Sequence, residues 1–90
     1  MIYRVHLSPH AVRAYKKLNS SIKPRLQAAI DALRTHPFSG PQVKQLKGQL
    51  RAYYRYRAGD YRIVYTVAQQ ARIVSIDYIQ HRNDVYRHLE

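Results

Sequence analysis

Three arginines, Arg55, Arg57 and Arg62, stand close together in a stretch of the chain that is rich in tyrosine. A guanidinium group donates several hydrogen bonds in a planar fork, and this fork matches the oxygens of a phosphate group. Guanidinium groups that lie side by side repel one another, so their grouping costs stability unless an anion binds among them. These residue types therefore predict a phosphate-binding surface, provided that the fold places the three side chains on one face.

The element that must position these arginines is a predicted β-hairpin, with strands near residues 50–57 and 60–68 and a turn at residues 58–60. Tyr, Ile and Val are typical of strands, and Gly59 supplies the dihedral angles of a tight turn. Side chains alternate between the two faces of a strand. If the aromatic and aliphatic residues of the second strand face the core, Arg62 faces outward. The hairpin then brings all three arginines onto one exposed surface.

The rest of the chain predicts a small α+β domain. Ser8-Pro9 has the pattern of a helix N-cap followed by proline at the first helical position, and the polar residues 19–21 are expected to cap a second helix. A three-stranded antiparallel meander is expected, with an antiparallel pair of helices on one face of the sheet. The predicted elements are a strand at 2–7, helices at about 9–18 and 20–35, a loop at 37–48, the two hairpin strands, a third strand at 71–79 and a short C-terminal helix capped by Asn83 or Asp84.

Length and charge limit what the chain can be. Ninety residues suffice for one domain, which we place at residues 1–90. The formal net charge is +11, from 16 Lys and Arg against 5 Asp and Glu, and this excess favours a polyanionic partner. No apolar run reaches the roughly 20 residues of a membrane span and no signal peptide is visible, so we expect a cytoplasmic protein without membrane contact. Cysteine is absent and the histidines lack metal-ligand spacing, so we expect no metal site and no cofactor.

Four segments carry a recognisable pattern. They are Leu46-Lys47-Gly48, the arginine-rich strand that follows, Gly59-Asp60-Tyr61-Arg62-Ile63-Val64-Tyr65 and His81-Arg82-Asn83-Asp84-Val85-Tyr86. These segments, with the order of the elements and the chain length, resemble the RelE/ParE superfamily of bacterial and archaeal toxins over nearly the whole chain. RelE-type members are ribosome-dependent mRNA endonucleases that an antitoxin holds inactive, whereas ParE-type members inhibit DNA gyrase. The resemblance implies a toxin of a type II toxin-antitoxin system, and it favours the RelE-type branch because basic residues occupy most of the motif positions.

The resemblance also implies a catalytic set at Arg55, Arg57, Arg62, Arg82 and Tyr86. The hairpin arginines would bind phosphates, Arg82 would lie near the leaving group, and Tyr86 would orient or stack on a base. The implied reaction is a metal-independent attack of the RNA 2′-hydroxyl on the adjacent phosphate, which yields a 2′,3′-cyclic or 3′-phosphate and a free 5′-hydroxyl. Guanidinium groups suit the charge that develops on the phosphate in this reaction.

Other basic and aromatic positions are expected to contact RNA. These are Lys44, Lys47, Arg51, Tyr53 and His81. A lysine that some relatives carry at the start of the arginine-rich strand falls on Tyr53 here. The implied partners are a cognate acidic antitoxin and the ribosome with its mRNA, including contacts with rRNA. Contact with DNA is expected only through the antitoxin complex.

Purely structural explanations compete with these functional ones. Exposed arginines are usually a solvated surface, and Tyr86 could simply hold the last helix against the sheet. Clustering of the arginines together with the large positive charge favours phosphate contact. Three hypotheses follow: a RelE-type mRNA endonuclease, a ParE-type gyrase inhibitor without nuclease activity, and a nucleic-acid-binding module without catalysis. The third predicts steeply salt-dependent RNA binding with no cleavage.

Overall fold

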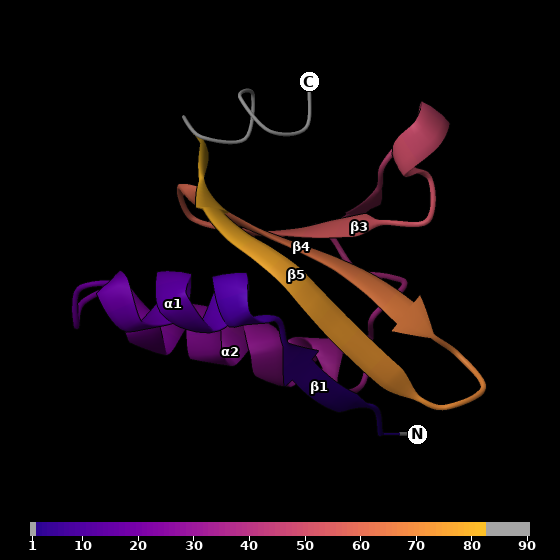
Figure 1. Cartoon of the computed structure of the whole chain (residues 1–90), viewed down its shortest axis with the longest axis horizontal. Helices are drawn as coiled ribbons and strands as arrows, with labels where there is room; N and C mark the ends of the chain where they lie inside the picture. Colours follow the sequence, from indigo (N-terminus) through magenta and orange to yellow (C-terminus); the bar gives the residue numbers. More distant parts are fainter. Residues whose placement is uncertain (1, 83–90) are drawn as a thin grey trace.

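The computed structural model describes residues 2–82, which form an α+β domain with one sheet. Within these residues the strands lie in the order β1-β5-β4-β3-β2, and both α-helices cover the same face of the sheet (Figure 1). The elements are β1 (Arg4–Leu7), α1 (Pro9–Lys17), α2 (Lys23–Leu33), β2 (Val43–Gln45), the 3₁₀ helix η1 (Gly48–Leu50), β3 (Tyr54–Ala58), β4 (Tyr61–Ala68) and β5 (Ile73–His81). The predicted fold class is therefore confirmed, and the predicted C-terminal helix with Asn83 or Asp84 lies outside the described residues.

The predicted meander β3-β4-β5 is present and antiparallel throughout. The strand β1 adds to it in parallel with β5, while β2 pairs antiparallel with β3 at the opposite edge. The expectation of a continuous loop at residues 37–48 was wrong, because Val43–Gln45 forms this edge strand. The expected strand start near residue 50 was also wrong, because Gly48–Leu50 forms η1 and delays β3 until Tyr54.

The two helix starts differ in how they are capped. The Ser8 side chain caps α1 as predicted, since its Oγ accepts a hydrogen bond from the Ala11 N–H at 3.0 Å. The predicted side-chain cap of α2 was wrong. Ser21 Oγ donates to Asn19 Oδ1 at 2.6 Å, so these two polar side chains bond to each other instead of to the backbone, and the helix begins at Lys23 after Ile22.

The core lies between the helices and the sheet. The residues buried in it include Ala11 of α1, Leu18 directly after α1, and Leu26, Ala29 and Leu33 of α2. Neither helix in the described range has the length and apolar character that a membrane crossing would need.

A single tyrosine ties the sheet to the loop that follows α2. Tyr65 is fully buried, and its hydroxyl donates to the carbonyl oxygen of Pro37 at 2.7 Å. Its ring stacks on Tyr54 at 5.8 Å, and Tyr54 in turn meets Phe38 edge-on at 5.5 Å. Burial raises the pKa of the Tyr65 hydroxyl well above its ordinary value. These contacts fix β3 and β4, the strands that carry the arginines, against the helical layer.

Candidate nucleic-acid interface

The register of β3 and β4 places the three hairpin arginines on one face of the sheet. Arg57 lies opposite Arg62, and Arg55 lies opposite Val64. The positions between them pair Tyr56 with Ile63, which belongs to the core on the helical side. The arginines therefore lie on the side away from the helices, and the predicted grouping is confirmed.

The neighbouring strands extend this surface at both sides. On β2, Lys44 pairs with Arg55, so its side chain shares the outward face. On β5, Tyr78 pairs with Val64 and Gln80 pairs with Arg62. We call this surface the arginine face, and it consists of the outward side chains of Lys44, Arg55, Arg57, Arg62, Val64, Tyr78 and Gln80.

The turn between β3 and β4 is short because of one glycine. Gly59 has a φ of +62° and stands first of the two turn residues, as a tight hairpin turn requires. A β-carbon at Gly59 would lie 2.6 Å from Nη1 of Arg25, so the guanidinium of this α2 residue rests against the turn. The turn thus sets the register that aligns Arg57 with Arg62.

The positive charges of the arginine face act on one another. Partial burial lowers the pKa of the Arg55 guanidinium, and the charges of Arg57 and Arg62 lower it further. Arg55 is held in place because its Nη1 donates to the carbonyl oxygen of Gln42 at 2.8 Å. Arg57 and Arg62 form no side-chain hydrogen bond or ion pair with residues 2–82, so their donors are available to an anion.

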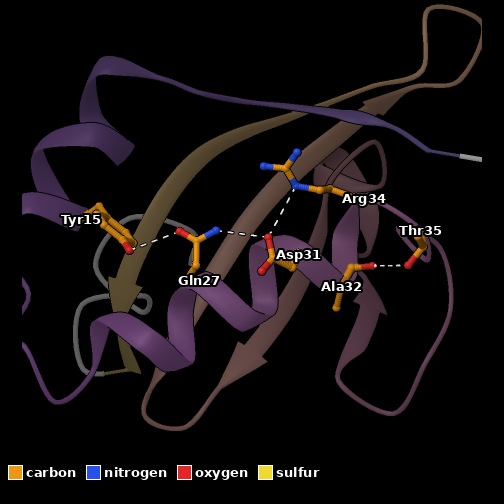
Figure 2. Close-up of polar contacts among 6 residues, drawn as sticks. All are labelled: Tyr15, Gln27, Asp31, Ala32, Arg34 and Thr35. Carbon is orange, nitrogen blue, oxygen red and sulfur yellow. Dashed lines mark hydrogen bonds and ion pairs between the residues drawn. The ribbon is translucent and has the colours of Figure 1, made fainter.

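The acidic residues of the described range do not neutralise this surface. Asp31 pairs with Arg34 at 3.6 Å on α2, where it belongs to a chain of exposed contacts that also joins Gln27 to Tyr15 (Figure 2). That pair is the one ion pair within residues 2–82. The arginine face therefore keeps its charge until a partner brings an anion.

Asp77 marks an irregularity beside the arginine face. Val64 pairs with Tyr78 but the next residue, Tyr65, pairs with Ile76, so Asp77 is a β-bulge residue without a partner of its own. The charge of Asp77 raises the pKa of the Tyr53 hydroxyl, with burial and a hydrogen bond to Asp77 as further causes. Tyr53 thus lies beside the bulge, close to the tyrosine of the arginine face.

The other predicted RNA contacts are spread over the molecule. Lys47 and Arg51 flank η1 and are exposed. His81 pairs with Tyr61, and its ring meets the Tyr61 ring edge-on at 5.3 Å. Tyr61 packs against the core, so His81 lies on the helical side, where it lines a cleft of about 280 Å³ with Arg25. The structure does not bring His81 to the arginine face.

The two C-terminal members of the implied catalytic set are only partly described. Arg82 is exposed, and its backbone N–H donates to the carbonyl oxygen of Asp60 at 2.7 Å, which holds it beside the hairpin turn. Tyr86 lies outside the described residues. Within residues 2–82, no group of His, Asp or Glu side chains could hold a metal ion.

Sequence reasoning missed Asp77 and Gln80 as neighbours of this surface. The apolar pattern of β5 carries a usable signal, because the spacing between buried residues changes from two at Val74 and Ile76 to three at Ile79. A step of three within a strand indicates a bulge, and a bulge reverses which residues face outward beyond it.

Comparison with known proteins finds this small α+β domain in one class of toxins. The family model described as ParE toxin of type II toxin-antitoxin system, parDE, matches residues 5–86. The chain belongs to this family, within the RelE/ParE toxin superfamily, and is a RelE-like toxin of a type II toxin-antitoxin system.

Proteins similar to this chain are found both by sequence and by structure. A protein of Methanocaldococcus jannaschii that carries the name toxin RelE1 is 29% identical over 89 residues, which are 97% of this chain and 98% of that protein. The archaeal RelE-RelB complex from Pyrococcus horikoshii is similar with a TM-score of 0.78 and 29% identity, over 91% of this chain and 97% of that one. The toxin-antitoxin complex RelBE2 from Mycobacterium tuberculosis is similar with a TM-score of 0.71 and 28% identity, over 91% of this chain and 100% of that one.

Proposed function

We propose that this toxin is a RelE-type endoribonuclease that cleaves mRNA in the ribosomal A site. The observation that carries the proposal is the arginine face, where Arg55, Arg57 and Arg62 share one surface without a carboxylate partner. Such a surface costs stability in the free protein and becomes favourable when phosphate groups lie against it. The RNA backbone supplies those groups at regular intervals.

The proposed reaction uses the substrate's own nucleophile. The 2′-hydroxyl attacks the adjacent phosphorus, the bond from the 2′-oxygen to phosphorus forms, and the bond to the 5′-oxygen breaks. The 2′-proton leaves to a base, and the 5′-oxygen takes up a proton. The products are a 2′,3′-cyclic phosphate and a free 5′-hydroxyl. Since guanidinium groups can neutralise the charge on the phosphate, the proposed reaction needs no metal ion.

The proposed roles follow the positions of the residues. Arg55, anchored on Gln42, would bind a phosphate next to the scissile one, while Arg57 and Arg62 have unused donors for the phosphate that reacts. Arg82, held beside the turn, would lie near the leaving oxygen, and Tyr86 would orient or stack on a base. Removing one preorganised donor of this kind typically costs about 10²–10³ in rate.

A wider basic surface would hold the ribosome-bound RNA. Lys44 belongs to the arginine face, and Lys47 and Arg51 extend the positive charge around η1. Tyr53, beside the bulge, offers a ring to a base. These residues would contribute to affinity for mRNA and rRNA, and affinity spread over many contacts tolerates single substitutions.

We also propose an acidic antitoxin as the cellular partner. The relatives from P. horikoshii and M. tuberculosis are found in toxin-antitoxin complexes. The net charge of +11 complements an acidic segment that covers the arginine face or displaces the segment with Tyr86. DNA would be contacted only by that complex.

Primer extension on ribosomes programmed with a defined mRNA tests the proposal. A truncated product at the A-site codon, dependent on toxin and ribosome together, supports endonuclease activity. Intact mRNA with normal translation contradicts it. The magnesium that ribosomes require stays constant, and the cyclic phosphate product is identified by mass spectrometry of the cut RNA.

The second candidate is inhibition of DNA gyrase. It is favoured by the matching family model, which is that of ParE toxins. In that case the toxin would inhibit supercoiling of a relaxed plasmid by purified gyrase and leave A-site mRNA intact. Running both assays with the same toxin preparation separates the two functions.

A further inference from the structure

Gln80 is a buried polar side chain without a bonding partner for its oxygen. It is 5% exposed, and its Oε1 accepts no hydrogen bond from residues 2–82. Leaving a buried acceptor unsatisfied costs stability, so native proteins seldom keep one without a reason. A methionine of nearly the same shape would avoid that cost at this position.

The residue directly across from Gln80 carries the donors that the oxygen lacks. Arg62 pairs with Gln80 between β4 and β5, and the bulge at Asp77 turns Gln80 to the arginine face on which Arg62 lies. Arg62 is half-buried and bonds to none of the described side chains. An acceptor without a hydrogen bond thus lies across from a guanidinium whose donors form no bond with residues 2–82.

The positive charges around Arg62 are not balanced by an anion in the described range. Arg62 lies opposite Arg57, with Arg55 also close by. Because both charges stand on β3, they repel the Arg62 guanidinium from that side and leave it without a partner to fix its position. A phosphate bound among them would remove this repulsion and allow the fork to settle against the sheet.

We infer that Gln80 positions Arg62 for phosphate binding, in that its Oε1 accepts one Arg62 N–H while the remaining donors of the fork bind a phosphate oxygen. The inference rests on the proposed function, since it gives Arg62 the phosphate as its ligand. Gln80 is a positioning residue in this account, because it acts through Arg62 and does not contact the substrate. Stability that the free protein loses at Gln80 is recovered when the ligand is bound.

Gln80→Met tests this role, because methionine keeps the shape of glutamine and removes the acceptor. We expect single-turnover cleavage on programmed ribosomes to fall about tenfold, as for loss of one orienting hydrogen bond. Ribosome affinity should stay within about twofold, since the wider basic surface is intact. The melting temperature should be unchanged or higher, because an unsatisfied acceptor has been removed. A loss of activity that merely follows a lower melting temperature would overturn the inference.

A pair of matched backgrounds shows whether Gln80 acts through Arg62. In Arg62→Lys the charge remains but the fork is gone, so adding Gln80→Met should change the rate by less than about twofold. In Arg57→Lys the altered residue lies one strand further from Gln80, so Gln80→Met should still cost about tenfold. The inference would be overturned if Gln80→Met lowered the cleavage rate equally in the two backgrounds. It would also be overturned if Gln80→Met alone cleaved at the wild-type rate although Arg62→Lys lowered the rate.

A readout without cleavage separates this inference from the proposed function. With ¹⁵N-labelled arginine, inorganic phosphate should shift the Arg62 Nε–Hε resonance and slow the rotation of its guanidinium in the wild type. In Gln80→Met the shift should remain while the rotation stays fast. If phosphate has the same effect on rotation in both proteins, Gln80 does not position Arg62, whether or not the toxin cleaves mRNA.

Discussion

Arg57 and Arg62 lie directly opposite each other across β3 and β4, on the face of the sheet that the helices leave uncovered. Like charges in facing positions of an antiparallel pair destabilise it by a few tenths of a kcal/mol to about 1 kcal/mol. The fold therefore keeps an unfavourable pair at the centre of the arginine face. A pair of this kind is retained where a ligand makes use of it.

The first prediction concerns the stability of that pair. Arg57→Ala should raise the free energy of unfolding by up to about 1 kcal/mol at low salt, because it removes the repulsion from Arg62. In high salt the difference should shrink, since exposed charges are screened. Urea unfolding at two ionic strengths measures both effects. Arg13→Ala, on the exposed side of α1, serves as the control and should show little dependence on salt.

The second prediction concerns activity. Arg62→Ala and Arg82→Ala should each lower A-site cleavage by about 10²–10³, while the fold survives because neither side chain belongs to the core. Arg82→Lys separates charge from geometry, since it keeps the charge and loses the planar fork. Wild-type cleavage by all three folded variants would contradict the proposed site.

The grouping of the arginines was predictable because it depends on local rules alone. Alternation along two strands and a short turn at Gly59 decide which side chains share a face. The edge strand β2 was not predictable in the same way. Three residues between Pro41 and Gly48 are too few to show alternation, and their pairing with β3 is a contact between distant parts of the chain.

The burial of Gln80 could not be predicted from the sequence, for a different reason. A polar residue in a strand is expected to face water, and nothing in its type indicates burial. Its burial depends on how β5 twists past β4 after the bulge at Asp77 and on the side chains that surround it. The bulge could be inferred from the spacing of Ile76 and Ile79, but the missing hydrogen bond depends on three-dimensional packing.

The third prediction concerns alkaline pH. Burial raises the pKa of Tyr65 in the folded state, so above the ordinary tyrosine pKa of about 10 the unfolded chain releases a proton that the folded chain keeps. Stability should therefore be fully present below pH 10 and fall above it, by at most about 1.4 kcal/mol per pH unit for this group. Urea unfolding between pH 8.5 and about 11 measures the slope.

Tyr65→Phe is the control for that slope. It removes the ionisable hydroxyl together with its hydrogen bond to Pro37, so stability at neutral pH should fall by about 0.5–1.5 kcal/mol. The slope above pH 10 should become shallower without vanishing, because Asp77 raises the pKa of Tyr53 in the same direction. An unchanged slope in Tyr65→Phe would show that other groups cause the alkaline loss.

The fourth prediction concerns the turn that aligns the arginines. Gly59→Ala should lower the free energy of unfolding by about 1–2 kcal/mol, because alanine adopts a left-handed backbone with difficulty. Gly48→Ala is a matched control, since Gly48 has a φ of +65° but open space around it, whereas a β-carbon at Gly59 would meet Arg25. If Gly59→Ala lowers the free energy of unfolding more than Gly48→Ala does, the excess therefore measures the contact with Arg25.

That excess should be small and should disappear in the Arg25→Ala background, because an exposed guanidinium can move aside. A large excess that persists in Arg25→Ala would mean that the turn backbone itself has shifted. The register of β3 against β4 would then be in question, and cleavage should fall with it, since Arg57 and Arg62 would no longer face each other. Comparing the cleavage rates of Gly59→Ala and Gly48→Ala at equal folded fraction decides whether this turn serves the arginine face or only the stability of the sheet.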